Sequence, residues 1–344
     1  TLKLDGQPLL DPGNPARWIK DRAQAPAPLP RAFVEFTSGD RLPGSIVGFR
    51  DGTEQSYDPL PPHFLVRPEI TLATPSPGSD APVRVLARFV RRLVWQRRDR
   101  DDFLPSTVLL RDGRSLPYRA ARFGDGLVNL LVADGQRKIY FSEIAEIHFP
   151  ANDSWSNYFD EIAMLSPTGT SRLFQIETNQ GLTLTSSFER FFSRGDGGPQ
   201  NFLQWIHGLQ PAWSLDLLWV PSSTIWMRRF FMPHEVPLSR RWPGKSVEKS
   251  LLSGTGRRAQ SNRNVQQGPL HSGGQDFGWG FGVHATSELH FDLPTSARIF
   301  RASIGLDRIA GRGGCVRARV FADGTPAAPL FESPFLVGSQ PAEP

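Results

Sequence analysis

Short runs of alternating apolar and polar residues recur along most of the chain. They predict β-strands, because successive side chains of a strand point to opposite faces. In SELHFDL (287–293), for example, Leu289, Phe291 and Leu293 share one face, which we expect to be buried. Few windows have the period of a helix, and 32 glycines and 31 prolines favour turns between short strands. The sequence therefore predicts an all-β fold.

A strand, a glycine-containing hairpin turn and a second strand that passes through Leu-Pro occur twice, over residues 33–49 and 107–123. One constant offset aligns the two copies. The aligned pairs are Val34 and Val108, Phe36 and Leu110, Leu42 and Leu116, Pro43 and Pro117, and Phe49 and Phe123. Similar residues at so many aligned positions indicate an internal repeat.

The two copies also end alike, over residues 83–95 and 137–149. Here the offset differs, because a proline-rich insert at residues 58–82 lengthens the first copy. The aligned pairs are Val85 and Ile139, Val90 and Ile144, Leu93 and Ile147, and Trp95 and Phe149. A unit of this kind, about 45 residues long, resembles a small SH3-like or Sm-like β-barrel. A degenerate third copy begins near residue 172 and ends near residue 231.

These patterns divide the chain into five parts. In order, they are a proline-rich lead-in (1–30), a first small β-barrel-like repeat (31–98), a second (105–150), a degenerate third β unit (170–232) and a β-sandwich (233–344). The third unit contains a belt of four tryptophans, namely Trp205, Trp213, Trp219 and Trp226. Aromatic residues at this density fill a core or domain interface, or line a sugar platform, and we favour the core.

Basic residues concentrate in two runs, residues 88–100 and 254–265, and the net charge is +5. Such runs bind polyanions when they lie on one exposed face. Aspartates follow the first run directly, so we interpret it as a solvated strand edge and do not favour a nucleic-acid partner. No stretch of about 18 apolar residues occurs, so no membrane span is predicted.

Cys315 is the one cysteine, so neither an internal disulfide nor a Cys-x-x-Cys metal motif can form. We interpret it as a small buried residue of a strand. The chain also has no G-x-S-x-G motif, H-E-x-x-H motif or P-loop, and no recognisable pair of catalytic carboxylates. The sequence therefore predicts no enzyme activity, no catalytic residue, no metal ligand and no cofactor.

Several C-terminal blocks, read in order, resemble one known family. They are NRNVQQGPLHSGG, GWGFGVHATSELHFDLP, FRASIGLD, GCVRARVFADG and LFES, within residues 262–333. The family is NPCBM, named as a carbohydrate-binding module, and the resemblance implies a galactose-binding-domain-like jelly-roll β-sandwich with a carbohydrate or glycan partner. This version of the module, with RNVQQGPL before the glycine-rich turn, resembles the modules attached to exported proteins of planctomycete-type bacteria, so we expect a secreted or cell-envelope (periplasmic or extracellular) setting. The family's sandwich would continue after VGSQPAEP, and we expect further sequence or a closing partner to complete it.

The resemblance gives four candidate carbohydrate-binding residues, which are Trp279, His284, Asp307 and Arg312. Trp279 either stacks on a pyranose ring or plugs the core under its loop. His284, in the family's G-[LV]-H motif, either donates to a sugar hydroxyl or bonds to the backbone. Asp307 and Arg312 either add polar contacts or only form a turn. Jelly rolls of this kind often hold a structural Ca²⁺, but no calcium loop is recognisable.

The predicted function is a non-catalytic exported protein that binds carbohydrate through its C-terminal module, with the β repeats as a spacer or scaffold. The alternative is a structural subunit of an extracellular or envelope-associated assembly, in which the sandwich and the tryptophan belt contact other protein subunits. A third hypothesis is a polyanion or nucleic-acid binder that uses the barrel-like units and the first arginine run.

Overall fold

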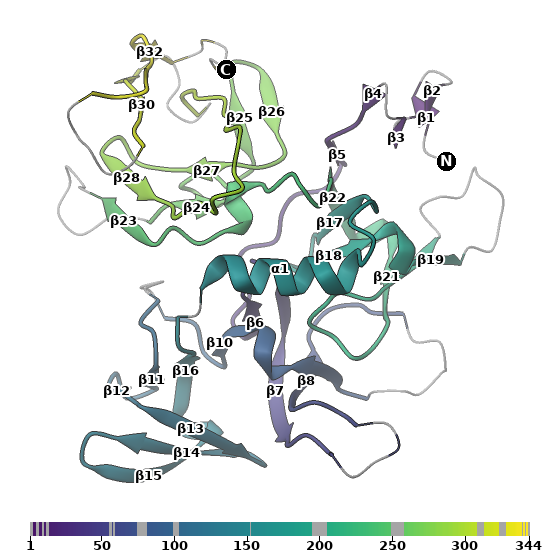
Figure 1. The fold of residues 1–344 in the computed structure, drawn as a ribbon, viewed down its shortest axis with the longest axis vertical. Coiled ribbons are helices and arrows are strands. Elements are labelled where there is room, and N and C mark those ends of the chain that lie inside the picture. The colour runs from purple at the N-terminus through teal and green to yellow at the C-terminus, as the bar shows by residue number, and fades with distance from the viewer. Residues whose placement is uncertain are drawn as a thin grey trace. The chain divides into compact units, whose positions relative to one another are not determined.

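The computed structural model describes most of the chain, in two compact units, Thr1–Val236 and Pro237–Pro344 (Figure 1). The described residues are 3–4, 7–8, 10–11, 14–54, 57, 59–73, 81–98, 103–151, 153–194, 205–248, 258–307, 313–322, 328–338, 340 and 342. Strands are the main regular elements of both units, and α1 (Ser154–Leu165) is the one α-helix within these ranges. The predicted all-β class is therefore confirmed.

The first repeat is a five-stranded path in the order β10-β6-β7-β8-β9. Its elements are β6 (Phe33–Phe36), β7 (Arg41–Arg50), β8 (His63–Pro68), β9 (Val83–Leu86), the 3₁₀ helix η1 (Ala87–Phe89) and β10 (Val90–Val94). The start of β7 pairs with β6 and the rest pairs with β8. The change of partner falls at Gly44, where a Cβ would lie 2.4 Å from the carbonyl oxygen of Arg67. Only glycine fits such a close backbone approach.

The second repeat follows the same path, with two strands in the place of β7. Its elements are β11 (Thr107–Leu110), β12 (Ser115–Pro117), β13 (Ala120–Gly124), β14 (Leu127–Val132), β15 (Gly135–Tyr140), η2 (Phe141–Glu143) and β16 (Ile144–His148). The register also recurs. The cross-strand neighbours of Val34 in the first repeat are Leu42 and Leu93, and those of Val108 in the second are Leu116 and Ile147.

A third segment has the same succession of strands, with its last strand returning to pair with its first. Its elements are β17 (Leu173–Thr178), β18 (Thr183–Ser187), η3 (Phe188–Arg190), β19 (Phe191–Arg194), β20 (Ile206–Leu209), β21 (Leu218–Pro221), η5 (Ser222–Thr224) and β22 (Ile225–Phe231). α1 precedes it, and the Asp153 side chain caps that helix by accepting from the N–H groups of Trp155 and Ser156.

The three repeats share one twelve-stranded sheet, because β10 pairs with β16 and β7 with β18. In the lead-in, β5 (Trp18–Lys20) adds to β22 at one end, after four two-residue strands, β1 (Lys3–Leu4), β2 (Gln7–Pro8), β3 (Leu10–Asp11) and β4 (Asn14–Pro15). Within the described residues, no pairing joins the two ends of a repeat's path. The repeats are thus open barrel-like sheets, and no barrel closes.

Aromatic side chains fill the core where the first two repeats meet. The aligned residues Phe49 and Phe123 have ring centroids 5.5 Å apart, and Phe64 lies 4.9 Å from Phe123. In the tryptophan belt, Trp213 and Trp226 are each only 1% exposed. The core interpretation therefore fits these two tryptophans, whereas Trp205 and Trp219 are half-buried.

The first basic run is not a solvated strand edge at its centre. Arg91 and Arg92 both donate to the carboxylate of Glu35, at 2.5 and 2.9 Å, and Glu35 is 1% exposed. Glu146, also buried, accepts from His148 Nε2 at 2.7 Å. The interpretation as a solvated edge was wrong for Arg91 and Arg92, because buried carboxylates on neighbouring strands pair with them.

The second unit consists of short antiparallel strand pairs. They are β23 (Lys245–Glu248) with β28 (Ser287–His290), β24 (Gln260–Ser261) with β27 (Phe281–Gly282), β25 (Leu270–Ser272) with β26 (Gln275–Phe277), β29 (Cys315–Val316) with β32 (Leu336–Val337), and β30 (Arg319–Val320) with β31 (Phe331–Glu332). The 3₁₀ helix η6 (Leu238–Arg240) precedes them.

Two burial predictions in this unit were wrong. Leu293 is 54% exposed, because β28 ends at His290 and the alternation of a strand does not continue to residue 293. Cys315 is exposed as well, since it lies on a two-residue strand with a single neighbouring strand.

Candidate functional site

The glycine-rich stretch begins with a tight hairpin between β25 and β26. Gly273 and Gly274 form its two-residue loop, with φ angles of 54° and 85°. Positive φ at both positions is the type I′ geometry that matches the twist of paired strands, and glycine adopts it without steric cost. The two glycines therefore set the position of the residues that follow β26, including Trp279.

The later glycines bring β27 close to the preceding loop. A Cβ on Gly282 would lie 2.3 Å from the carbonyl oxygen of Arg263, so only glycine fits. That loop is organised by Asn264, which is 5% exposed and accepts from the N–H groups of Gln266 and Gly268 at 3.0 and 2.8 Å. The RNVQQG block and the glycine-rich stretch thus fold as one local structure.

Trp279 and His284 lie on either side of the two-residue strand β27, and both are half-buried. Trp279 stands in the bend after β26. His284 follows β27, and its carbonyl oxygen accepts from the Ser287 hydroxyl at 3.0 Å. Its ring Nε2 is buried and has no hydrogen-bond partner among the described residues. The bond from Ser287 therefore holds the His284 backbone, and the Nε2 atom of its ring does not reach solvent.

Asp307 is half-buried in a loop beside a different strand. Two residues before it, Gly305 packs against β25, where a Cβ would lie 2.4 Å from the hydroxyl oxygen of Ser272. The chain that leads to Asp307 therefore packs against β25 at Gly305, whereas Trp279 and His284 flank β27. Arg312 lies outside the described residues.

Two kinds of feature are absent from the described part of the chain. It holds no group of three or more His, Cys, Asp or Glu side chains arranged for a metal ion. None of its helices is long and apolar enough to cross a membrane.

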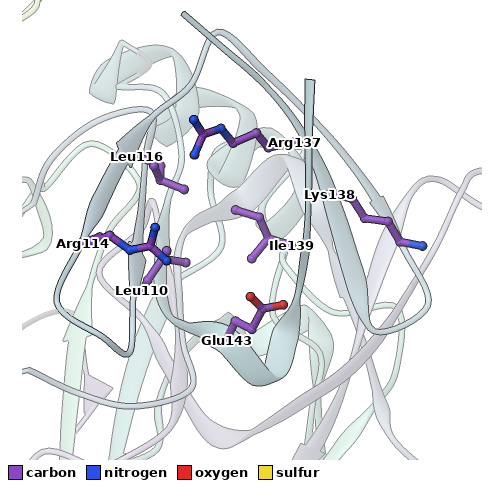
Figure 2. Close-up of a pocket in the computed structure, with 7 residues that line it drawn as sticks. All are labelled: Leu110, Arg114, Leu116, Arg137, Lys138, Ile139 and Glu143. Atoms are coloured by element: carbon purple, nitrogen blue, oxygen red, sulfur yellow. The ribbon is translucent and has the colours of Figure 1, made fainter. Parts of the chain in front are cut away.

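A pocket that sequence reasoning missed lies in the second repeat, with a volume of about 270 Å³. Figure 2 shows Leu110, Arg114 and Leu116 on one wall and Arg137 and Ile139 on the other. Glu143 points in from the base, and Lys138 points away from the centre, beside the pocket. The walls come from the β11–β12 hairpin and from β15. The repeat alignment held a signal for this pocket, because residues that line it differ in charge from the residues aligned with them in the first repeat.

The charges around this pocket are mostly paired. Arg114 Nε donates to Asp112 at 2.7 Å and holds the pKa of that exposed carboxyl below its usual range. Arg137 likewise donates to the exposed carboxylate of Asp134 and lowers its pKa. Lys138 has no ion pair in the described residues, and its ammonium lies 5.3 Å from the ring centroid of Tyr140. Lys138 is thus the cation beside this pocket that is available to pair with the carboxylate of a bound ligand.

The comparisons with known proteins bear on the second unit. The comparison with curated proteins finds no match, and neither does the comparison with solved structures. The family model described as NPCBM/NEW2 domain matches residues 244–344. This confirms the resemblance predicted from the sequence blocks of the C-terminal third, and residues 244–344 are identified as an NPCBM/NEW2 domain.

Proposed function

We propose that the protein binds carbohydrate through its C-terminal unit and that the three β repeats form a scaffold. The match of residues 244–344 to a domain family named for carbohydrate binding carries this proposal. The half-buried Trp279 supports it, because solvent reaches part of this residue and an aromatic ring packs well on the C–H face of a sugar. The protein is exported and non-catalytic in this proposal.

The four candidate residues have different roles here. Trp279 stacks on the sugar ring. His284 positions the loop after β27 through its backbone contact with Ser287, because its Nε2 is buried. Asp307 supplies polar contacts to sugar hydroxyl groups from its own loop, and Arg312, which lies outside the described residues, has the same role in this proposal.

A glycan array probed with the labelled chain tests the proposal, followed by calorimetry on the best ligand. Trp279→Ala should weaken binding by about tenfold or more, since a lost aromatic stack costs about 1–2 kcal/mol. Phe192→Ala is a matched control, because Phe192 is an aromatic residue of the first unit that is 53% exposed. The Phe192→Ala variant should bind the sugar with the same affinity as the native chain. If no sugar binds at millimolar concentration, the proposal fails.

A second candidate is an interaction subunit of an extracellular or envelope-associated assembly. It is favoured by the exposed apolar side chains of the second unit, among them Ile299 (75% exposed), Leu330 (74%) and Phe335 (62%). Exposed apolar side chains that form one contiguous patch mark contact surfaces in other proteins. Cross-linking in the native host followed by mass spectrometry would identify protein neighbours at these residues, whereas a sugar-binding protein alone would give none there.

A further inference from the structure

In the first repeat, the place that corresponds to the Figure 2 pocket is filled by a side chain of the third repeat. Trp213 stacks on Phe36, with ring centroids 4.1 Å apart and planes 9° apart. Its indole Nε1 donates to Asp40 Oδ2 at 3.0 Å. Trp213 is 1% exposed, so its side chain is fully enclosed.

The backbone of the same segment adds to the edge strand β9. Leu86 N–H donates to the Trp213 carbonyl at 2.8 Å, and Leu215 N–H donates to the Arg84 carbonyl at 3.0 Å. The Asp216 carboxylate accepts from the Arg84 guanidinium at 2.6 and 2.9 Å. Residues 213–216 therefore dock on β9 through an isolated antiparallel bridge between Val85 and Ser214, with an aromatic residue in the pocket and an acidic residue three positions later on a cation.

The corresponding edge strand of the third repeat is also covered. Ala73 N–H donates to the carbonyl of Trp219 on β21 at 2.8 Å. Nearby, Thr71 and Gln180 exchange two hydrogen bonds, at 2.7 and 3.0 Å. The insert of the first repeat thus contacts the edge of the third.

The second repeat has a pocket at the corresponding place, with more charged residues in its lining, and no described residue fills it. Its edge strand β15 pairs only with β14 among the described residues. By the repeat alignment, Leu110 corresponds to Phe36, Arg114 to Asp40, Leu116 to Leu42, Lys138 to Arg84 and Ile139 to Val85. Cavities of about 150 Å³ hold benzene. The pocket, at about 270 Å³, therefore has room for an aromatic ring.

We propose that β15 and the pocket of Figure 2 bind an extended segment of another protein by strand addition. An aromatic or large apolar side chain enters between Leu116 and Ile139, which supply an apolar lining. An acidic side chain three residues later pairs with Lys138, which keeps the positive charge that Arg84 offers to Asp216. Backbone hydrogen bonds supply affinity, and these two side chains supply specificity.

Glu143 controls access to this edge. Its Oε1 accepts from the Tyr140 N–H at 3.2 Å, and by the alignment Tyr140 corresponds to Leu86, whose N–H binds the Trp213 carbonyl. The aligned residue of the first repeat is Phe89, which has no such acceptor. An incoming strand must therefore displace the exposed Glu143 side chain. Glu143→Ala should tighten binding about threefold or more, because the N–H is then available.

The experiment uses a fluorescein-labelled peptide, QPAWSLDL, which copies residues 210–217, and measures its anisotropy with the full chain. We expect saturable binding that Lys138→Glu weakens about fivefold or more. A peptide with lysine in place of the aspartate should restore binding to that variant. This charge swap separates β15 from β9, where Arg84 has the corresponding role. Arg122→Glu is the control, because it makes the same charge change on β13, which lies on the other side of β14 from β15.

Three results would overturn the proposal. One is no peptide binding at millimolar concentration to either the native chain or Glu143→Ala. Another is equal binding to the native chain and to Lys138→Glu. The third is a dimer that Lys138→Glu abolishes in the absence of peptide binding, which would make a second copy of the chain the occupant. Circular dichroism of each variant checks that the fold is intact.

Discussion

At the residue scale, His207 shows how burial and one neighbour determine a protonation state. It is 4% exposed, and its Nε2 lies 3.0 Å from the Ser222 hydroxyl, which accepts from Arg228 at 3.0 Å. The hydroxyl proton is then directed at Nε2, which suits a neutral ring. Burial, with the Arg228 guanidinium nearby, lowers the pKa of His207 to about 4.

This pKa makes the stability of the first unit depend on pH. As pH falls, the unfolded state binds the proton first, near pH 6.5. The stability that the neutral His207 ring contributes is therefore complete above that pH and is lost as pH falls toward 4. Between pH 7 and pH 4.5 the native chain should lose about 2–3 kcal/mol more unfolding free energy than His207→Gln. Urea unfolding at both pH values measures this difference, and equal losses in the two proteins would contradict it.

At the element scale, Gly44 explains why β7 is continuous while β12 and β13 are separate strands. The repeat alignment puts Tyr118 at the position of Gly44. Tyr118 is 7% exposed and its hydroxyl donates to the His148 carbonyl at 2.9 Å, so the chain turns there instead of continuing one strand. Burial also raises the pKa of Tyr118 to about 12. One glycine therefore determines whether this strand bends or breaks.

Gly44→Ala should destabilise the first unit by about 2–4 kcal/mol, because the new Cβ meets the Arg67 carbonyl and the backbone must move. Gly48→Ala on the same strand is the control, since its Cβ would make ordinary contacts of 3.5 Å. It should change stability by less than about 1 kcal/mol. Thermal unfolding followed by circular dichroism compares the two, and similar losses would refute the role of Gly44.

Alternation and alignment predicted the elements well, because strand formation and internal repeats leave a local signal. The register around Val34 and Val108 agrees with the aligned pairs. In the site, the glycines before Trp279 indicated a tight turn, and Gly273 and Gly274 form one. Contacts between distant segments leave no such signal. The burial of Arg92 with Glu35 and the docking of Trp213 could therefore not be predicted.

At the scale of the whole molecule, the repeats of the first unit are joined by more than strand pairing. Asp40, in the turn between β6 and β7, is fully buried. Its carboxylate accepts from Thr185 N–H at 2.7 Å, from the Thr185 hydroxyl at 2.8 Å, and from Gln175 and Trp213 at 3.1 and 3.0 Å. Every one of these donors belongs to the third repeat, so the first and third repeats should unfold together.

Asp40→Ala should therefore cost about 3–5 kcal/mol, because it leaves buried donors without an acceptor. Hydrogen exchange should show protection falling together in β6–β10 and in β17–β22. Asp125→Ala is the control, since Asp125 is 73% exposed and its pair with Arg50 lies at the surface, where ion pairs contribute about 0–1 kcal/mol. If protection fell only in the first repeat, Asp40 would be a local turn residue, and the repeats would unfold as separate units.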